Sequence, residues 1–190
     1  MKTINLNSNR LLVFYNKIVL LLLLNFNFLN GQSSDIDIIR DRVYHSILVD
    51  YSTNTIYSSG RDVGIVGLSS KESGFDNEAI KKILSDFDGD RWPYIHYEDV
   101  SREGFDNTIH LYNLLRLAVA YKSSASNYFN DKNILKTIIK GLWFWCDNDF
   151  IGENWWNNQI GTPNDLVHLM LIIGDELPNY LISKSQKIIS

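Results

Sequence analysis

The chain has 190 residues, 45% of them hydrophobic, which is enough for one domain with a hydrophobic core. Its formal net charge is −4, and because residues 1–31 hold three basic and no acidic residues, the remainder carries −7. This balance excludes nucleic acid as a default partner, since binding to phosphates requires a basic surface. The single cysteine, Cys146, excludes an internal disulfide framework and is predicted to be a buried thiol.

Residues 1–31 are predicted to form a secretory signal peptide. A positively charged N-terminal region precedes the apolar run 18–24. Small residues follow this run and could form the site at which a signal peptide is cleaved. The run is much shorter than the roughly 20 apolar residues of a transmembrane helix, and Asn25 and Asn27 interrupt its continuation. We therefore expect a secreted or periplasmic protein without a stable membrane anchor, with one domain over 32–190. The alternative is a buried N-terminal helix.

Beyond the signal peptide, apolar residues recur mostly at helical spacing, and no stretch alternates with a period of two. The spacing predicts an all-α protein with little β-structure. We expect helices over 35–50, 80–87 (capped by Asp76 or Asn77), 109–121, 134–146, 163–173 and 178–189. Pro163 is expected in the first turn of its helix, and 52–74 and 147–161 are expected to be loops.

This alternation of helices and loops is typical of antiparallel helical hairpins stacked side by side. In such a stack the loops gather at one end, where ligand sites tend to form. The last predicted helix has no partner within the sequence. We therefore expect the chain to be the truncated N-terminal part of a larger domain.

The most distinctive segment, 153–163, contains the adjacent tryptophans Trp155 and Trp156 among four amide side chains. If these side chains were buried, each indole N–H and each amide would need a hydrogen-bond partner. If the indoles were exposed, they would form an apolar patch of the kind used in recognition. Indoles stack on the apolar faces of sugar rings, and amides bond to sugar hydroxyls. The predicted substrate-binding residues are Asn154, Trp155, Trp156, Asn158 and Gln159. The alternative is a structural tryptophan knot that closes the loop.

The run Asn154-Trp155-Trp156, followed by 158–163, resembles the tryptophan-pair segment of the family 8 polysaccharide lyases, which include hyaluronate, chondroitin AC and xanthan lyases. Two weaker matches precede it in the same order. Residues 88–97 resemble the Asp-Gly segment of that family, and 110–121 resemble its first toroid helix. The resemblance covers roughly residues 80–178.

The resemblance implies the N-terminal part of an incomplete (α/α) toroid and an acidic polysaccharide substrate, with no cofactor or metal. The implied reaction is β-elimination at a uronic acid, in which the C5 proton is removed and the 4-O-glycosidic bond breaks. The catalytic Asn, His, Tyr and Arg of the family lie well downstream of the tryptophan pair. No catalytic residue is therefore assigned in this chain, and the rest of the lyase is expected downstream.

The family's aromatic patch positions the glycan, a role that the resemblance gives to Trp155 and Trp156 with Asn154 beside them. The histidines take no catalytic role in this interpretation. His110 and His168 lie on apolar helices and are predicted to be structural, whereas His96 stays open.

Two other functions stay open at this stage. One is an α/α-toroid glycoside hydrolase with paired carboxylates, for which Asp147, Asp149 and Glu153 are candidates. The other is a non-catalytic glycan-binding fragment. A lyase product carries an ultraviolet-absorbing double bond that a hydrolase product lacks. The acidic turn 86–90 lacks the bidentate glutamate of a calcium loop and is predicted to be a solvated turn.

Overall fold

The computed structural model of the chain describes residues 33–52 and 76–190. The predicted signal peptide and nearly all of the expected loop 52–74 lie outside these residues. Among the residues described, no helix has the length and apolar character needed to cross a membrane. The chain divides into two compact units, 1–43 and 44–190.

The first described helix, α2 (Ser33–Ser52), begins in the first unit and ends in the second. It confirms the helix expected over 35–50. Ile38 and Ile39 are exposed, and Arg40 forms an ion pair with Asp37 one turn earlier, at 3.6 Å. An exposed pair at this spacing contributes only a few tenths of a kcal/mol to the helix.

The second unit contains five further α-helices among its described residues. They are α3 (Asn77–Ser85), α4 (Thr108–Lys122), α5 (Lys132–Asn148), α6 (Thr162–Ile173) and α7 (Asn179–Ile189). A π-helical turn, η2 (Asn157–Gly161), precedes α6, and a 3₁₀ turn, η3 (Gly174–Glu176), follows it. No strand occurs in the part of the chain that the structure describes, where one isolated bridge joins Asp88 to Arg91. The expectation of an all-α protein is confirmed for these residues.

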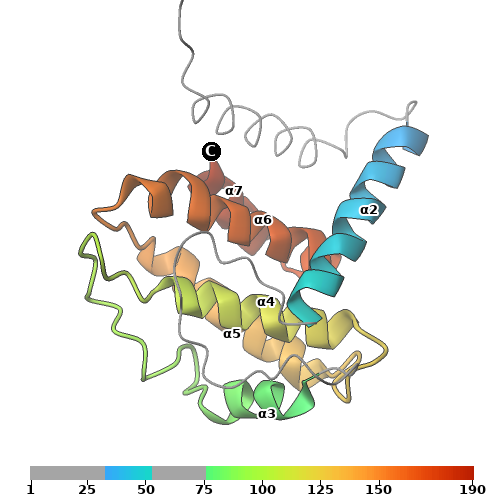
Figure 1. The fold of residues 1–190 in the computed structure, drawn as a ribbon, viewed down its shortest axis with the longest axis horizontal. Coiled ribbons are helices and arrows are strands. Elements are labelled where there is room, and N and C mark those ends of the chain that lie inside the picture. Colours follow the sequence, from blue (N-terminus) through green and yellow to red (C-terminus); the bar gives the residue numbers. More distant parts are fainter. Residues whose placement is uncertain (1–32, 53–75) are drawn as a thin grey trace, which may run out of the picture. The chain divides into compact units, whose positions relative to one another are not determined.

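The helix α4 forms the centre of this unit and packs against α3, α5 and α6. The last helix, α7, packs against α5 and α6, so the expectation that it has no partner within the sequence is wrong. Figure 1 shows α4 and α5 as an antiparallel hairpin, with α6 running in the same direction as α4. Every side chain from Asn113 to Tyr121 is buried. A helix that is buried on several sides needs apolar residues on more than one face, and the sequence of α4 has them. Burial of this apolar surface is the main stabilising contribution.

Two aspartates fix the starts of α3 and α5. The Ala79 backbone N–H donates to Oδ1 of Asp76 at 2.9 Å, and the Asn133 N–H donates to Oδ1 of Asp131 at 2.7 Å. Each bond satisfies one of the backbone donors that a helix start leaves without an intrahelical acceptor. The sequence correctly placed Asp76 as a candidate cap.

The prediction of a loop over 147–161 is wrong for the second half of this range. After α5 ends, the chain becomes helical again at Trp155 and passes through η2 into α6 without a break. Pro163 lies in the first turn of α6, as expected, although α6 continues the helical run that begins at Trp155. Proline has no N–H to donate and conflicts with the carbonyl four residues earlier, and the wider π turn just before it relieves this constraint.

Candidate functional site

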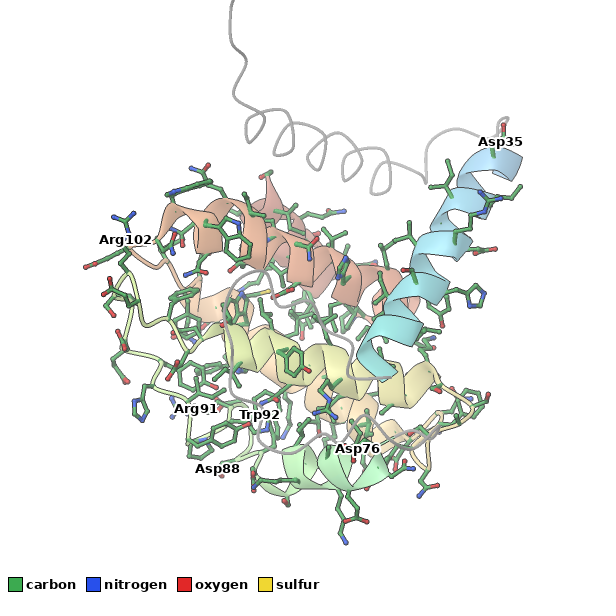
Figure 2. All side chains as sticks on the ribbon, viewed as in Figure 1. Asp35, Asp76, Asp88, Arg91, Trp92 and Arg102 are labelled. Atoms are coloured by element: carbon green, nitrogen blue, oxygen red, sulfur yellow. The ribbon has the colours of Figure 1, made fainter. Side chains whose placement is uncertain are left out.

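The candidate site lies at one end of the second unit, where the segment 98–107 before α4 meets the segment 149–156 after α5. The Glu153 N–H donates to the carbonyl oxygen of Val100 at 2.8 Å and joins the two segments. Phe105 is fully buried beneath Gly152, where a β-carbon would lie 2.9 Å from its ring. The side chain of Arg102 marks this end of the molecule in Figure 2.

The two tryptophans have different environments. Trp155 is 49% exposed, whereas Trp156 is half-buried. The Trp156 ring lies over Gly161, at which a β-carbon would stand 2.7 Å from Cζ3 of the indole. Trp155 is therefore accessible to a ligand, while Trp156 also serves to pack the helical turn.

Two of the predicted amides bond to the backbone of the site. Oδ1 of Asn154 accepts from the Trp156 N–H at 3.1 Å and so caps the helical turn that begins at the tryptophans. The Asn158 amide binds both polar groups of Gly152: the Gly152 N–H donates to Oδ1 at 2.9 Å, and Nδ2 donates to the Gly152 carbonyl at 2.7 Å. In this structure, Asn158 therefore holds the loop before the tryptophans.

The other two amides of the segment differ in exposure. Gln159 is exposed, and Asn157 is buried with a relative exposure of 1%. The predicted residues are thus brought together in one helical turn. Of the five, the structure leaves Trp155 and Gln159 the most accessible, and the hydrogen bonds of Asn154 and Asn158 were not visible in the sequence.

A ring cluster under the site holds the loop in place. The Phe150 ring lies 5.5 Å from that of Tyr97, 5.8 Å from that of Phe144 and 5.2 Å from that of Trp145, measured between centroids. Such pairs add roughly 0.5–1.5 kcal/mol each beyond the burial of their area. The loop after α5 is therefore anchored one residue after its left-handed C-cap, Asp149, whose φ is 45°.

His110 is fully buried and acts as a structural link, as the sequence predicted. Its Nε2 lies 2.9 Å from the Gly141 carbonyl oxygen and therefore carries the proton. Its Nδ1 accordingly accepts from the Tyr97 hydroxyl at 2.9 Å, and that hydroxyl oxygen accepts from the Trp92 N–H at 3.2 Å. Burial lowers the pKa of His110 from 6.5 to about 3, against the smaller opposite effect of the bond to Gly141.

The other two histidines considered in the sequence analysis contribute less to this end of the second unit. His96 is exposed in the segment before α4, and His168 is half-buried on α6. The Tyr97 phenol is also unsuited to proton transfer at neutral pH, because burial raises its pKa to about 12.

The carboxylates expected for a hydrolase are not arranged as a matched pair by any contact among the described residues. Asp147 forms an ion pair with Lys184 of α7 at 3.0 Å, and Asp149 is the C-cap of α5. Sequence reasoning missed Asp165, in the first turn of α6. Burial raises the pKa of its carboxyl from 3.8 to about 7, against the smaller opposite effect of a hydrogen bond from Asn164. Nothing in the local sequence signals this, since an acid in a first helical turn is ordinary.

Comparisons with known proteins agree with this architecture. The family model described as polysaccharide lyase family 8, N-terminal α-helical domain, matches residues 77–190. The chain is 29% identical over 82 residues to the chondroitinase-AC of Pedobacter heparinus, a match that covers 43% of this chain and 12% of that protein. It is 31% identical over 91 residues to a hyaluronate lyase of Enterococcus faecalis, covering 45% and 9%.

A solved structure of chondroitinase AC lyase, described with oligosaccharide complexes, superposes with a TM-score of 0.60 at 20% identity. The match covers 80% of this chain and 20% of that one, and it shows the fold alone. The chain thus corresponds to only a small part of each relative. Its helical hairpins are those of an incomplete (α/α) toroid. Because the family model matches more than half of it, the chain belongs to polysaccharide lyase family 8, of which it carries the N-terminal α-helical domain.

Proposed function

We propose that the chain is the N-terminal portion of an exported lyase that cleaves uronic-acid-containing glycans by β-elimination, and that it supplies the aromatic surface on which the glycan binds. Membership of the family supports the reaction class, and the relatives named above are a chondroitinase and a hyaluronate lyase. The observation that carries the binding role is Trp155, a half-exposed indole on a helical turn whose backbone is fixed by Asn154 and Asn158.

The Trp155 indole offers a flat apolar face to a pyranose ring, and burial of that face on binding provides both affinity and orientation. Trp156 holds the turn through its contact with Gly161, and the exposed amide of Gln159 is available to sugar hydroxyls. In this proposal, Asn154 and Asn158 support the site by fixing its backbone.

The chain contributes binding and not the proton transfer. Elimination needs a base for the C5 proton and a group that neutralises the uronate. His110 cannot serve, because both ring nitrogens are engaged and the buried ring stays neutral. In this proposal, the catalytic Asn, His, Tyr and Arg come from a segment downstream of Ser190.

The binding role is tested by replacing each tryptophan with alanine and titrating the protein with hyaluronan and chondroitin oligosaccharides. Trp155→Ala should weaken binding at least tenfold, equivalent to about 1.4 kcal/mol, with little change in melting temperature because the indole is half exposed. Trp156→Ala should lower the melting temperature as well, since it removes the ring packed on Gly161.

Three results would contradict the proposal. If Trp155→Ala leaves the affinity for both glycans unchanged, or if it lowers the melting temperature more than the affinity, the site assignment is wrong; the second result would make the pair a structural knot. If the native protein that contains this chain releases products without the ultraviolet absorbance of an unsaturated sugar, the reaction is hydrolysis and not elimination.

We further propose that residues 1–31 direct export and are then removed. The basic start and the short apolar run of the sequence support this role. The intact mass of the native protein, with N-terminal sequencing, should show a mature chain that begins close to residue 32. A mature protein that still begins at Met1 would contradict it.

A further inference from the structure

The outer sides of α5 and α7 each carry an exposed aromatic side chain. Trp143 of α5 is 42% exposed, and Tyr180 of α7 is 52% exposed. One exposed aromatic ring is ordinary on a protein surface, whereas two adjacent rings form an apolar patch of the kind used in recognition. Whether these two rings are adjacent depends on the register of α5 against α7.

Two side-chain contacts fix this register. Nζ of Lys184 donates to Oδ1 of Asp147 at 3.0 Å, and the Ser185 hydroxyl oxygen lies 3.5 Å from Sγ of Cys146. Both helices run opposite to α6, so α5 and α7 run in the same direction (Figure 1). Residues 146 and 147 of α5 are therefore level with residues 184 and 185 of α7.

The two aromatic residues lie one helical turn before the ion pair. With about 3.6 residues per turn, a residue four positions earlier lies on the same face of a helix. On α5, this spacing places Trp143 next to Asp147. On α7, it places Tyr180 next to Lys184. Because the helices run in the same direction and the ion pair joins them, Trp143 and Tyr180 are neighbours across the interface between α5 and α7.

Lysines extend both of these rows of residues. Lys136 and Lys140 lie on the same face of α5 as Trp143, at helical spacings of seven and three residues. On α7, Lys187 follows the ion-paired lysine by three residues. These three lysines are exposed. We define the lysine–aromatic face as Lys136, Lys140, Trp143, Tyr180, Lys184 and Lys187.

The charge of this face is opposite to that of its surroundings. The helices α5 and α7 together hold five lysines and one aspartate, a net charge of +4. The other residues of 76–190 hold six basic and fifteen acidic residues, a net charge of −9. A basic face on an otherwise acidic unit attracts an anionic ligand to that place and repels it elsewhere. Since Lys184 is paired with Asp147, the lysines that remain to meet an anion are Lys136, Lys140 and Lys187.

The lysine–aromatic face is separate from the tryptophan-pair turn. By helical spacing, Trp143 lies on the side of α5 opposite Ile138 and Trp145, which are buried in the core. The tryptophan-pair turn instead follows the end of α5 and packs against α6. A ligand bound along α5 and α7 would therefore occupy a different surface.

We propose that the lysine–aromatic face is a second binding surface for an acidic polysaccharide. Sugar rings of the polymer stack on Trp143 and Tyr180, and its carboxylates pair with Lys140 and Lys187. A polymer long enough to reach this face and Trp155 together is held at two places, which raises its overall affinity. The inference rests on the proposed function, because that function supplies an acidic polysaccharide as the ligand.

The first experiment counts glycan sites by titration calorimetry of the full chain with a hyaluronan hexasaccharide. The full chain should bind two molecules of the hexasaccharide. Trp143→Ala and Trp155→Ala should each bind one molecule, and the variant that carries both substitutions should bind none. The melting temperature of each variant shows whether it folds, and Trp143→Ala should fold because its indole is 42% exposed.

The contribution of charge is tested in the Trp155→Ala variant, where only the lysine–aromatic face should remain. Adding Lys187→Gln should weaken the hexasaccharide about two- to fivefold at low salt, because one exposed charge pair is lost. The difference should shrink as sodium chloride is raised, since salt screens exposed charges. An effect that does not change with salt would overturn the role of the lysine.

The matched control is Phe129→Ala. Phe129 is 49% exposed in the turn between α4 and α5, away from the rows that form the lysine–aromatic face. This substitution removes a comparable exposed ring, so the number of hexasaccharide sites should stay at two. A second control replaces the hexasaccharide with polyglutamate, which has carboxylates and no sugar rings. Equal affinity for polyglutamate would mean that the face recognises charge alone, and the inference would fail.

A second experiment uses the native protein that contains this chain. Trp143→Ala should raise the KM for polymeric hyaluronan about threefold or more, and should raise the KM for a tetrasaccharide less, because only the polymer can reach both sites. A KM for the polymer that does not change would mean that the face is not available to the glycan in the native protein. That result would overturn the inference.

The outcomes separate this inference from the proposed function. If the full chain binds one hexasaccharide and only Trp155→Ala abolishes it, the proposed function stands and the second surface is wrong. If only Trp143→Ala abolishes it, the second surface stands and the binding role of the tryptophan pair fails. If Trp143→Ala instead abolishes self-association seen by sedimentation and leaves both glycan sites intact, the face is a contact between two copies and the inference fails.

Discussion

The contact between Trp156 and Gly161 couples the tryptophan pair to the start of α6. The Gly161 backbone has φ −61° and ψ −62°, values that an alanine adopts readily. The absence of a side chain at Gly161 is therefore required by the neighbouring indole and not by the backbone. The same reasoning does not apply to Gly174, at φ −53° and ψ −38°, where a β-carbon would meet nothing within 4 Å.

These two glycines provide a matched pair of substitutions. Gly174→Ala should raise the free energy of unfolding by roughly 0.5–1 kcal/mol, because alanine loses less backbone entropy on folding. Gly161→Ala should lower it by about 1–3 kcal/mol, because the indole must move away from the new methyl group. Urea unfolding gives both values, and tryptophan fluorescence should shift in Gly161→Ala alone. Equal stability of the two variants would mean that the indole moves at no cost.

His110 shows that an apolar helix can carry a polar side chain that was correctly predicted to be structural. The sequence placed it on the buried face of a helix, and the structure adds the partners: the Tyr97 hydroxyl and the Gly141 carbonyl. Those partners lie 13 and 31 residues away along the chain. No local pattern could have identified them, because only the packing of α4 on α5 brings Gly141 to the ring.

At the scale of elements, the helices with strong apolar periodicity were predicted well. The α4 and α5 helices extend one or two residues beyond the expected ranges at either end, as end fraying and local capping allow. The helical turn at Trp155 was missed for a physical reason. Tryptophan and asparagine have only moderate helix propensity, and Gly161 and Pro163 interrupt the usual pattern.

The prediction of the site depended on residue types and on resemblance, whereas its geometry depends on tertiary contacts. The sequence identified Trp155 and Trp156 as a pair but gave no way to tell the exposed indole from the packed one. That difference arises from Gly161, one helical turn further on, through a π turn that no spacing predicted. The use of Asn158 as a clamp on Gly152 likewise follows only from the fold of the loop.

At the scale of the whole molecule, two ionisable groups make its stability depend on pH in opposite directions. The pKa of His110 is about 3, below its ordinary 6.5, so the unfolded chain binds a proton that the fold does not. Its contribution is fully present above pH 6.5 and is lost as the pH falls toward 3. The pKa of Asp165 is about 7, above its ordinary 3.8, so the fold binds the extra proton. Its contribution is fully present below pH 3.8 and is lost as the pH rises through 7.

Replacing either His110 or Asp165 should leave the pH dependence of stability that is due to the other residue. Asp165→Asn should be more stable than the original chain at about pH 8 and should lose stability more steeply on acidification to about pH 4.5, because only the His110 effect remains. His110→Gln, whose amide can still bond to Tyr97 and Gly141, should lose less stability over the same range. Urea midpoints at several pH values give both slopes. Parallel profiles for the three proteins would show that neither group titrates as described.

The interface between α5 and α7 contains Cys146, which is the one thiol of the chain. Cys146 is 8% exposed, its Sγ lies 3.5 Å from the Ser185 hydroxyl, and burial raises its pKa above the ordinary value. The packing of α5 on α7 therefore lowers the reactivity of the sulfur in two ways. It shields the sulfur from reagents, and it keeps the thiol in its unreactive protonated form. The rate at which Cys146 is alkylated therefore reports how readily α7 moves away from α5. Mass spectrometry can measure this rate without any engineered label.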